Sequence, residues 1–269
     1  MARILLRAWK AIRFSTWATG PSASEQQRAE NAENMIRSAI KASTKLQARN
    51  IKVFTQGSYR NRVNVRRDSD VDVGILCFDT YFPEYPDDNV KATIEKSAVD
   101  ATYTYAVFKN EIEEALVDKF GRASVSRGSK SFDIKENSYH VEADVAAFFE
   151  HRRYTSAYDY LSGVEMIPDD GRPPRVRNWP EQHYTKGVNK NDRTGRRYKR
   201  MVRILKSLSN EMSSEGIASA KNAPSFLVEC LVWNAPNENF SYSSYRPCEP
   251  EILKVQMLFR SSMARSRID

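Results

Sequence analysis

A short segment near residue 70 alternates between apolar and acidic side chains. The apolar members are Val71, Val73 and Ile75, and the acidic ones are Asp70 and Asp72. Such an alternation predicts a strand with one buried face, so both carboxylates point to the same side. Two carboxylates held this close repel each other unless a cation lies between them. The pattern therefore predicts a divalent metal site, most suited to Mg²⁺, which prefers hard oxygen ligands, with Mn²⁺ as the alternative.

A second polar element lies just upstream of this strand. Gly57 and Ser58 follow a predicted strand over residues 51–55 and precede a turn that carries Arg60. A glycine lets backbone N–H groups approach a phosphate closely, and a serine hydroxyl adds one more donor. Paired carboxylates that hold two ions about 3.5–4 Å apart, next to a phosphate-binding turn, indicate phosphoryl transfer.

Together the two elements resemble the signature of a known family. Gly57-Ser58-Tyr59, followed by Val-Arg-Arg-Asp-Ser-Asp-Val-Asp over residues 65–72, resembles the DNA polymerase β-type nucleotidyltransferases. The sequence of this segment is most similar to that of the bacterial cGAS/DncV-like enzymes, the CD-NTases of antiphage (CBASS) systems. This resemblance implies a third carboxylate on a later strand, and Asp144 matches it. It also implies that Asp70, Asp72 and Asp144 are catalytic and bind two metal ions.

The resemblance further implies residues that hold the donor triphosphate. Gly57 and Ser58 would bind its β- and γ-phosphates, with charge added by Arg60 or Arg66. A lysine and a serine of the helical part complete this group in the family, and Lys206 and Ser225 match them by position. Arg203, on the same predicted helix as Lys206, is assigned to nucleotide binding as well. Ser225 also fits an N-cap, and Lys206 is expected to be exposed; the alternative for this basic run is a solvated helix face.

The expected fold is α/β (α+β), a polymerase β-type core with a mixed sheet, a long N-terminal brace helix and a C-terminal helical lobe. Breaker residues from Pro168 to Pro174 and the basic run beyond them divide the chain into a core over residues 1–165 and a substrate-binding lobe over residues 166–269. Helices are predicted over residues 24–49, 105–120, 197–208 and 250–263, and strands over 51–55, 71–76, 123–126, 132–134 and 140–149.

Composition limits the partners and the compartment. The net charge is +8, which suits nucleoside triphosphates or nucleic acid without choosing between them. The three cysteines are scattered, which favours a reducing, cytoplasmic compartment. No histidine has a cysteine at zinc-ligand spacing, whereas animal cGAS grips DNA with a zinc thumb, so no obligatory nucleic acid is expected. No apolar run approaches the ~18 residues of a membrane span.

These observations lead to one main hypothesis and two alternatives. The main hypothesis is a Mg²⁺-dependent enzyme that joins nucleoside triphosphates into a cyclic di- or trinucleotide second messenger in antiphage defence and releases pyrophosphate. A regulatory protein partner and an effector activated by the cyclic nucleotide are the partners that this role implies. The alternatives are an RNA-tailing or oligoadenylate-synthase-like enzyme, and a catalytically inactive module that binds nucleotides or nucleic acid. The bases, the linkage and the ring size stay open.

Overall fold

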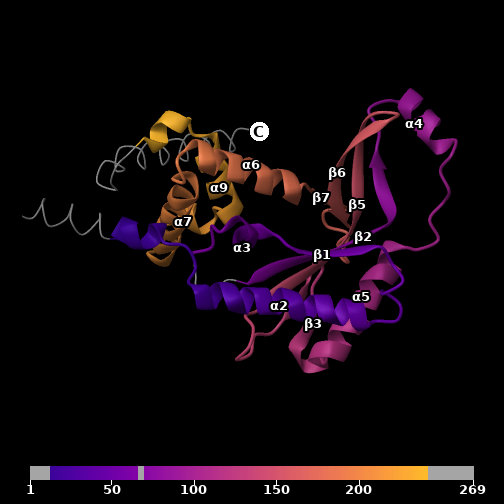
Figure 1. Cartoon of the computed structure of the whole chain (residues 1–269), viewed down its shortest axis with the longest axis horizontal. Helices are drawn as coiled ribbons and strands as arrows, with labels where there is room; N and C mark the ends of the chain where they lie inside the picture. The colour runs from indigo at the N-terminus through magenta and orange to yellow at the C-terminus, as the bar shows by residue number, and fades with distance from the viewer. Residues whose placement is uncertain (1–12, 66–69, 242–269) are drawn as a thin grey trace, which may run out of the picture. The chain divides into compact units, whose positions relative to one another are not determined.

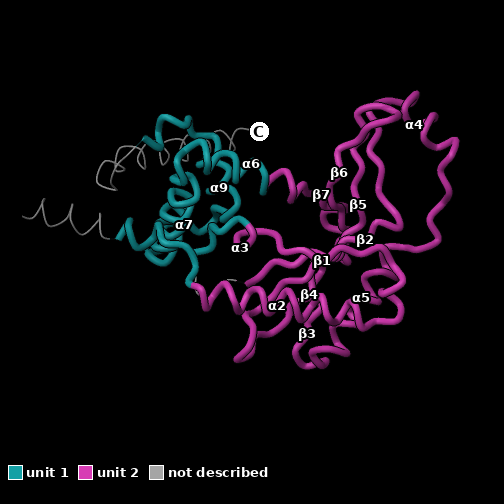
Figure 2. The backbone as a smooth tube through the Cα atoms, viewed as in Figure 1, with its two compact units in different colours: residues 1–22, 61–67, 184–269 teal, residues 23–60, 68–183 magenta. Residues whose placement is uncertain are grey.

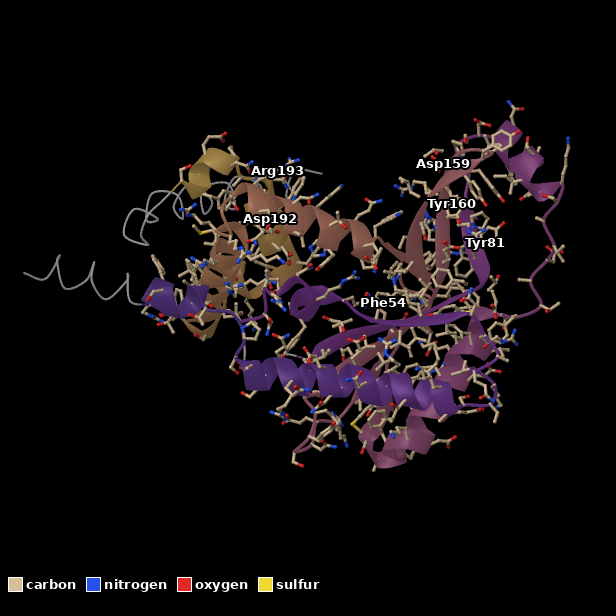
Figure 3. All side chains as sticks on the ribbon, viewed as in Figure 1. Phe54, Tyr81, Asp159, Tyr160, Asp192 and Arg193 are labelled. Carbon is tan, nitrogen blue, oxygen red and sulfur yellow. The ribbon has the colours of Figure 1, made fainter. Side chains whose placement is uncertain are left out.

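The computed structural model describes residues 13–65 and 70–241 (Figure 1). The chain divides into two compact units, which Figure 2 colours separately. The sheet unit comprises residues 23–60 and 68–183. The helical unit comprises residues 1–22, 61–67 and 184–269. This division differs from the boundary predicted after residue 165, because the sheet unit continues to His183 and the helical unit includes two N-terminal segments.

The sheet unit is built on a mixed sheet, in which the described residues form seven strands. The strands lie in the order β1-β2-β5-β4-β3, with β6 beside the distal half of β5 and β7 beside β6. Strands β2 and β5 run parallel, and the other neighbours run antiparallel. The strands are β1 (Ile51–Thr55), β2 (Val71–Glu84), β3 (Val125–Arg127), β4 (Phe132–Ile134), β5 (Ala143–Ser156), β6 (Asp159–Met166) and β7 (Val176–Asn178).

Helices cover one face of this sheet. The helices of the unit are α2 (Ala23–Ala42), α3 (Gly57–Asn61), α4 (Asp88–Glu95) and α5 (Tyr105–Phe120). Helices α2 and α5 lie side by side along the sheet (Figure 1). The ring of Phe108 on α5 stacks on Phe149 of β5, with 5.4 Å between the ring centroids. Because side chains alternate along a strand, the odd-numbered positions of β5 face the helices and the even-numbered ones, including Asp144, face the opposite side.

The helical unit has a core of its own. Its helices are α6 (Pro180–Arg193), which starts in the sheet unit, α7 (Tyr198–Ser214), α8 (Ala218–Lys221) and α9 (Ser225–Asn234), with a 3₁₀ turn at Asn237–Phe240 and a helical segment over residues 13–18. Val202 of α7, Val232 of α9 and Val63 are fully buried there, and Phe14 is buried beside them. No described helix is long and apolar enough to cross a membrane.

Several predicted bounds differ from the structure. The first long helix ends at Ala42, and residues 43–49 form turns. Strand β2 continues to Glu84, although a loop was expected from Phe82, because its distal half pairs with the distal half of β5. Helix α7 extends to Ser214, beyond the predicted end at residue 208. The predicted helix over residues 250–263 and the side chain of Arg66 lie outside the described residues.

Candidate active site

Strand pairing brings the predicted carboxylates together. Asp72 of β2 lies directly opposite Asp144 of β5 in the parallel register. Asp70 immediately precedes β2 and is exposed. Neighbouring strands lie about 4.8 Å apart, so Asp72 and Asp144 project side by side from the face that α2 and α5 leave uncovered. The strand register therefore brings Asp72 and Asp144 together, and Asp70 lies two residues before Asp72 on the same chain segment.

Gly57 lies against the side chain of Asp72. Its φ of +63° is a left-handed conformation that a residue with a Cβ adopts at a cost. A Cβ built at this position would overlap Oδ2 of Asp72 and would lie 2.9 Å from its Cγ. The approach is fixed by the chain, because Gln56 N–H donates to the Asp72 carbonyl at 2.8 Å and continues the pairing of β1 with β2. Both the turn and the close approach require glycine at this position.

The carboxylates of the site raise one another's pKa values. Burial is the main cause that raises the pKa of Asp144 to about 7, and the nearby charge of Asp133, a hydrogen bond with it, and the charges of Asp70 and Asp72 act in the same direction. Burial and the charge of Asp133 also raise the pKa of Asp70. Such shifts are expected where like charges share one site without a cation between them.

Asp133 is the carboxylate that sequence reasoning missed. It lies at the centre of β4, directly opposite Asp144, on the side of β5 away from Asp72. The strand over residues 132–134 was predicted, and in the structure Asp133 alternates there with the buried Phe132 and Ile134. What the sequence does not show is that β4 pairs with β5 at Asp144.

The donor set fits a hard divalent cation. Asp70, Asp72 and Asp144 offer carboxylate oxygens alone, the ligand type that Mg²⁺ and Mn²⁺ favour. Within the described part of the chain, no three carboxylate, histidine or cysteine side chains already converge on one point as a preformed metal site. Cation binding would thus include a side-chain adjustment around Asp72 and Asp144.

The three predicted nucleotide contacts of the helical part lie in the helical unit. Lys206 on α7 is only 4% exposed, so the expectation of an exposed lysine was wrong. Its Nζ lies 3.6 Å from Oε2 of Glu229 on α9, whose side chain is also buried. The Arg203 guanidinium donates to the carbonyls of Ala18, at 2.5 and 2.8 Å, and Arg62, at 2.6 Å. These bonds give Arg203 a structural role, and its predicted contact with a nucleotide remains a prediction.

Two serines and an arginine complete the predicted set. Ser225 is the exposed first residue of α9; the N-cap is Pro224 and no side chain caps the helix, so the expectation of Ser225 as N-cap was wrong. Ser58 is half-buried on α3, next to Gly57. Arg60 of the same helix forms an ion pair with Glu181 at 2.5 Å, which holds its guanidinium against the start of α6.

Comparisons with known proteins identify the family of this chain. The cGAS/DncV-like nucleotidyltransferase C-terminal helical domain matches residues 185–264. A cyclic dipyrimidine nucleotide synthase CdnE from Legionella pneumophila is 43% identical, and the alignment covers 87% of this chain and 79% of that protein. A protein of the same name from Cecembia lonarensis is 40% identical, over 83% of this chain and 75% of the relative.

Solved structures of CdnE enzymes are similar to this chain in fold. A CdnE c-UMP-AMP synthase from Rhodothermus marinus, with Apcpp and Upnpp, superposes with a TM-score of 0.80 at 26% identity, covering 92% of this chain and 82% of that one. A CdnE cyclic dinucleotide synthase from Elizabethkingia meningoseptica, with GTP and Apcpp, has a TM-score of 0.73 at 30% identity, covering 90% and 81%. The protein is therefore a nucleotidyltransferase that belongs to the cGAS/DncV-like (CD-NTase) family.

Proposed function

We propose that this enzyme joins two nucleoside triphosphates into a cyclic dinucleotide that serves as a second messenger in antiphage defence. The observation that carries the proposal is the arrangement of Asp72 and Asp144 side by side, with Gly57 held against Asp72. Its family relatives, named as cyclic nucleotide synthases, support the same reaction.

In each of two steps, a ribose hydroxyl of one nucleotide attacks the α-phosphorus of a triphosphate. The new oxygen–phosphorus bond replaces the bond to pyrophosphate, and the hydroxyl proton leaves to solvent. Two divalent ions, when bound, supply the charge that activates the hydroxyl and neutralises the leaving pyrophosphate. Asp70 and Asp72 would hold both ions, and Asp144 would complete the one near the hydroxyl. The other groups only position reactants, as is usual in phosphoryl transfer.

Four residues are proposed to bind the phosphates of the donor. Gly57 and Ser58 would contribute a backbone N–H and a hydroxyl, and Lys206 with Ser225 would add a charge and a further hydroxyl. Lys206 would have to exchange its contact with Glu229 for one with the triphosphate, or share its donors between them. The net charge of +8 favours the approach of such polyanions.

Pyrimidine nucleotides are the substrates we propose, with Mg²⁺ as the ion. The relatives from Legionella pneumophila and Cecembia lonarensis, 43% and 40% identical, are both named cyclic dipyrimidine nucleotide synthases. The product is proposed to form without added DNA or RNA, since the sequence has no cysteine–histidine cluster at zinc-ligand spacing.

A labelled-nucleotide panel tests this proposal. The purified, nuclease-treated enzyme is incubated with Mg²⁺ and one labelled triphosphate at a time, in every pairing with an unlabelled one, and the products are then treated with phosphatase. We expect a small phosphatase-resistant product whose yield is highest with UTP and CTP. Products made only from purine nucleotides would overturn the choice of bases. Extension of added RNA into a ladder, with no resistant product, would instead identify a tailing enzyme.

A further inference from the structure

A third carboxylate continues the row that Asp72 and Asp144 begin. Asp133 pairs with Asp144 on one side of β5, and Asp72 pairs with Asp144 on the other. The three residues occupy consecutive strands at the same level, with about 4.8 Å between neighbours. Phe132 and Ile134, on either side of Asp133, are buried in the core, so the Asp133 side chain points to the opposite face, where the site lies.

Asp133 acts directly on Asp144. Asp133 lies directly opposite Asp144 in the strand pairing. Its charge is the largest cause after burial that raises the pKa of Asp144, and a hydrogen bond between the two side chains acts in the same direction. After burial, the charge of Asp133 is also a cause of the raised pKa of Asp70. The pairing of β4 with β5 thus adds a carboxylate, that of Asp133, to the three that the proposed reaction uses.

We propose that Asp133 is a positioning residue of the cation site. It orients the carboxyl group of Asp144 from the side away from Asp72 and adds negative charge there, which tightens the binding of the cation nearest Asp144. This inference rests on the proposed function, because it assigns a fourth residue to the same site. Groups that contact metal ligands in this way commonly change metal affinity about 10- to 100-fold when they are replaced.

Manganese alone provides a readout that does not depend on turnover. Free Mn²⁺ is measured by electron paramagnetic resonance during titration of the full-length, metal-free enzyme without nucleotide. Asp133→Asn keeps the shape of the side chain but removes its charge and replaces one acceptor oxygen with an NH₂ donor. Asp159→Asn, at the exposed start of β6, is the matched control for the loss of one negative charge, and Asp72→Asn is the control for the site itself.

We expect Asp133→Asn to weaken Mn²⁺ binding about tenfold, with a melting temperature of the metal-free protein equal to or above that of the wild type. Asp159→Asn should leave the affinity unchanged, and Asp72→Asn should nearly abolish binding. If Asp72→Asn abolishes binding while Asp133→Asn behaves like Asp159→Asn, the inference is wrong and the proposed metal site stands. If Asp72→Asn binds Mn²⁺ as the wild type does, the metal site itself is wrong.

A second variant covers the case in which Asp133→Asn does not fold. Asp133→Glu keeps the charge and lengthens the side chain by one methylene group, at a half-buried position on the edge of the site. It should retain Mn²⁺ affinity within about threefold of the wild type if charge is what matters. A folded Asp133→Glu protein that loses affinity as severely as Asp72→Asn would contradict the role of charge at this position.

Discussion

Gly57→Ala is the substitution whose effect the structure defines most sharply. At a φ of +63° an alanine pays about 1–2 kcal/mol for the left-handed conformation. The added Cβ would also lie 2.9 Å from Cγ of Asp72, whereas non-bonded carbons need about 3.5–4.0 Å. The Asp72 carboxylate therefore has to move by roughly 1 Å or the turn has to open. A misplacement of about 1 Å at a reacting centre costs on the order of 10²-fold in rate.

Gly171→Ala is the matched control for this experiment. Gly171 has nearly the same φ, +65°, but its Cβ would meet nothing within 4 Å. Chemical denaturation should show a loss of about 1–2 kcal/mol in the free energy of unfolding for Gly171→Ala, with normal turnover. Gly57→Ala should lose more stability than the control and about 10²-fold in kcat. If Gly57→Ala turns over nucleotide at nearly the wild-type rate, the close approach of Gly57 to Asp72 has no part in the site.

Three further predictions concern charged side chains. Asp72→Asn should abolish product formation while the protein stays folded, since an amide fills the same volume but cannot neutralise divalent ions; near-normal turnover would refute the assignment. Because the folded state keeps the Asp144 proton up to about pH 7 and the unfolded chain releases it near pH 4, the metal-free protein should lose stability as the pH rises between these values. Melting temperatures of Asp144→Asn should lack this component, and parallel pH profiles for variant and wild type would exclude it. Lys206→Ala should cost ~3–5 kcal/mol in unfolding free energy because it removes one charge of a buried ion pair, and Glu229→Gln in the same chain should restore part of the loss. A Lys206→Ala protein with wild-type stability would mean that the buried pair contributes nothing.

The carboxylates of the site could be predicted because their signal is local. Alternation from Asp70 to Ile75 places both acidic side chains on one face of a strand whatever lies beside it. Asp144 required the family resemblance as well, since one carboxylate in an apolar strand does not identify its neighbour. The close packing of Gly57 against Asp72 became visible only once the pairing of β1 with β2 was known.

The parts that could not be predicted depend on contacts between distant segments. Asp133 joins the site because β4 pairs with β5, and a three-residue strand carries no signal that selects its partner. The burial of Lys206 depends on Glu229, which lies on another helix. Likewise, Arg203 is fixed by carbonyls of residues 18 and 62, which no helical periodicity on α7 reveals.

The most direct test of the central claim is the stoichiometry of pyrophosphate release. Wild-type enzyme is incubated with Mg²⁺ and pyrimidine triphosphates, and released pyrophosphate is measured against nucleotide consumed, with Asp72→Asn as the blank. Closing a ring removes the pyrophosphate of every nucleotide, so we predict one pyrophosphate per nucleotide consumed and a product without a terminal phosphate. A linear dinucleotide keeps one triphosphate, so one pyrophosphate for every two nucleotides consumed would contradict cyclisation.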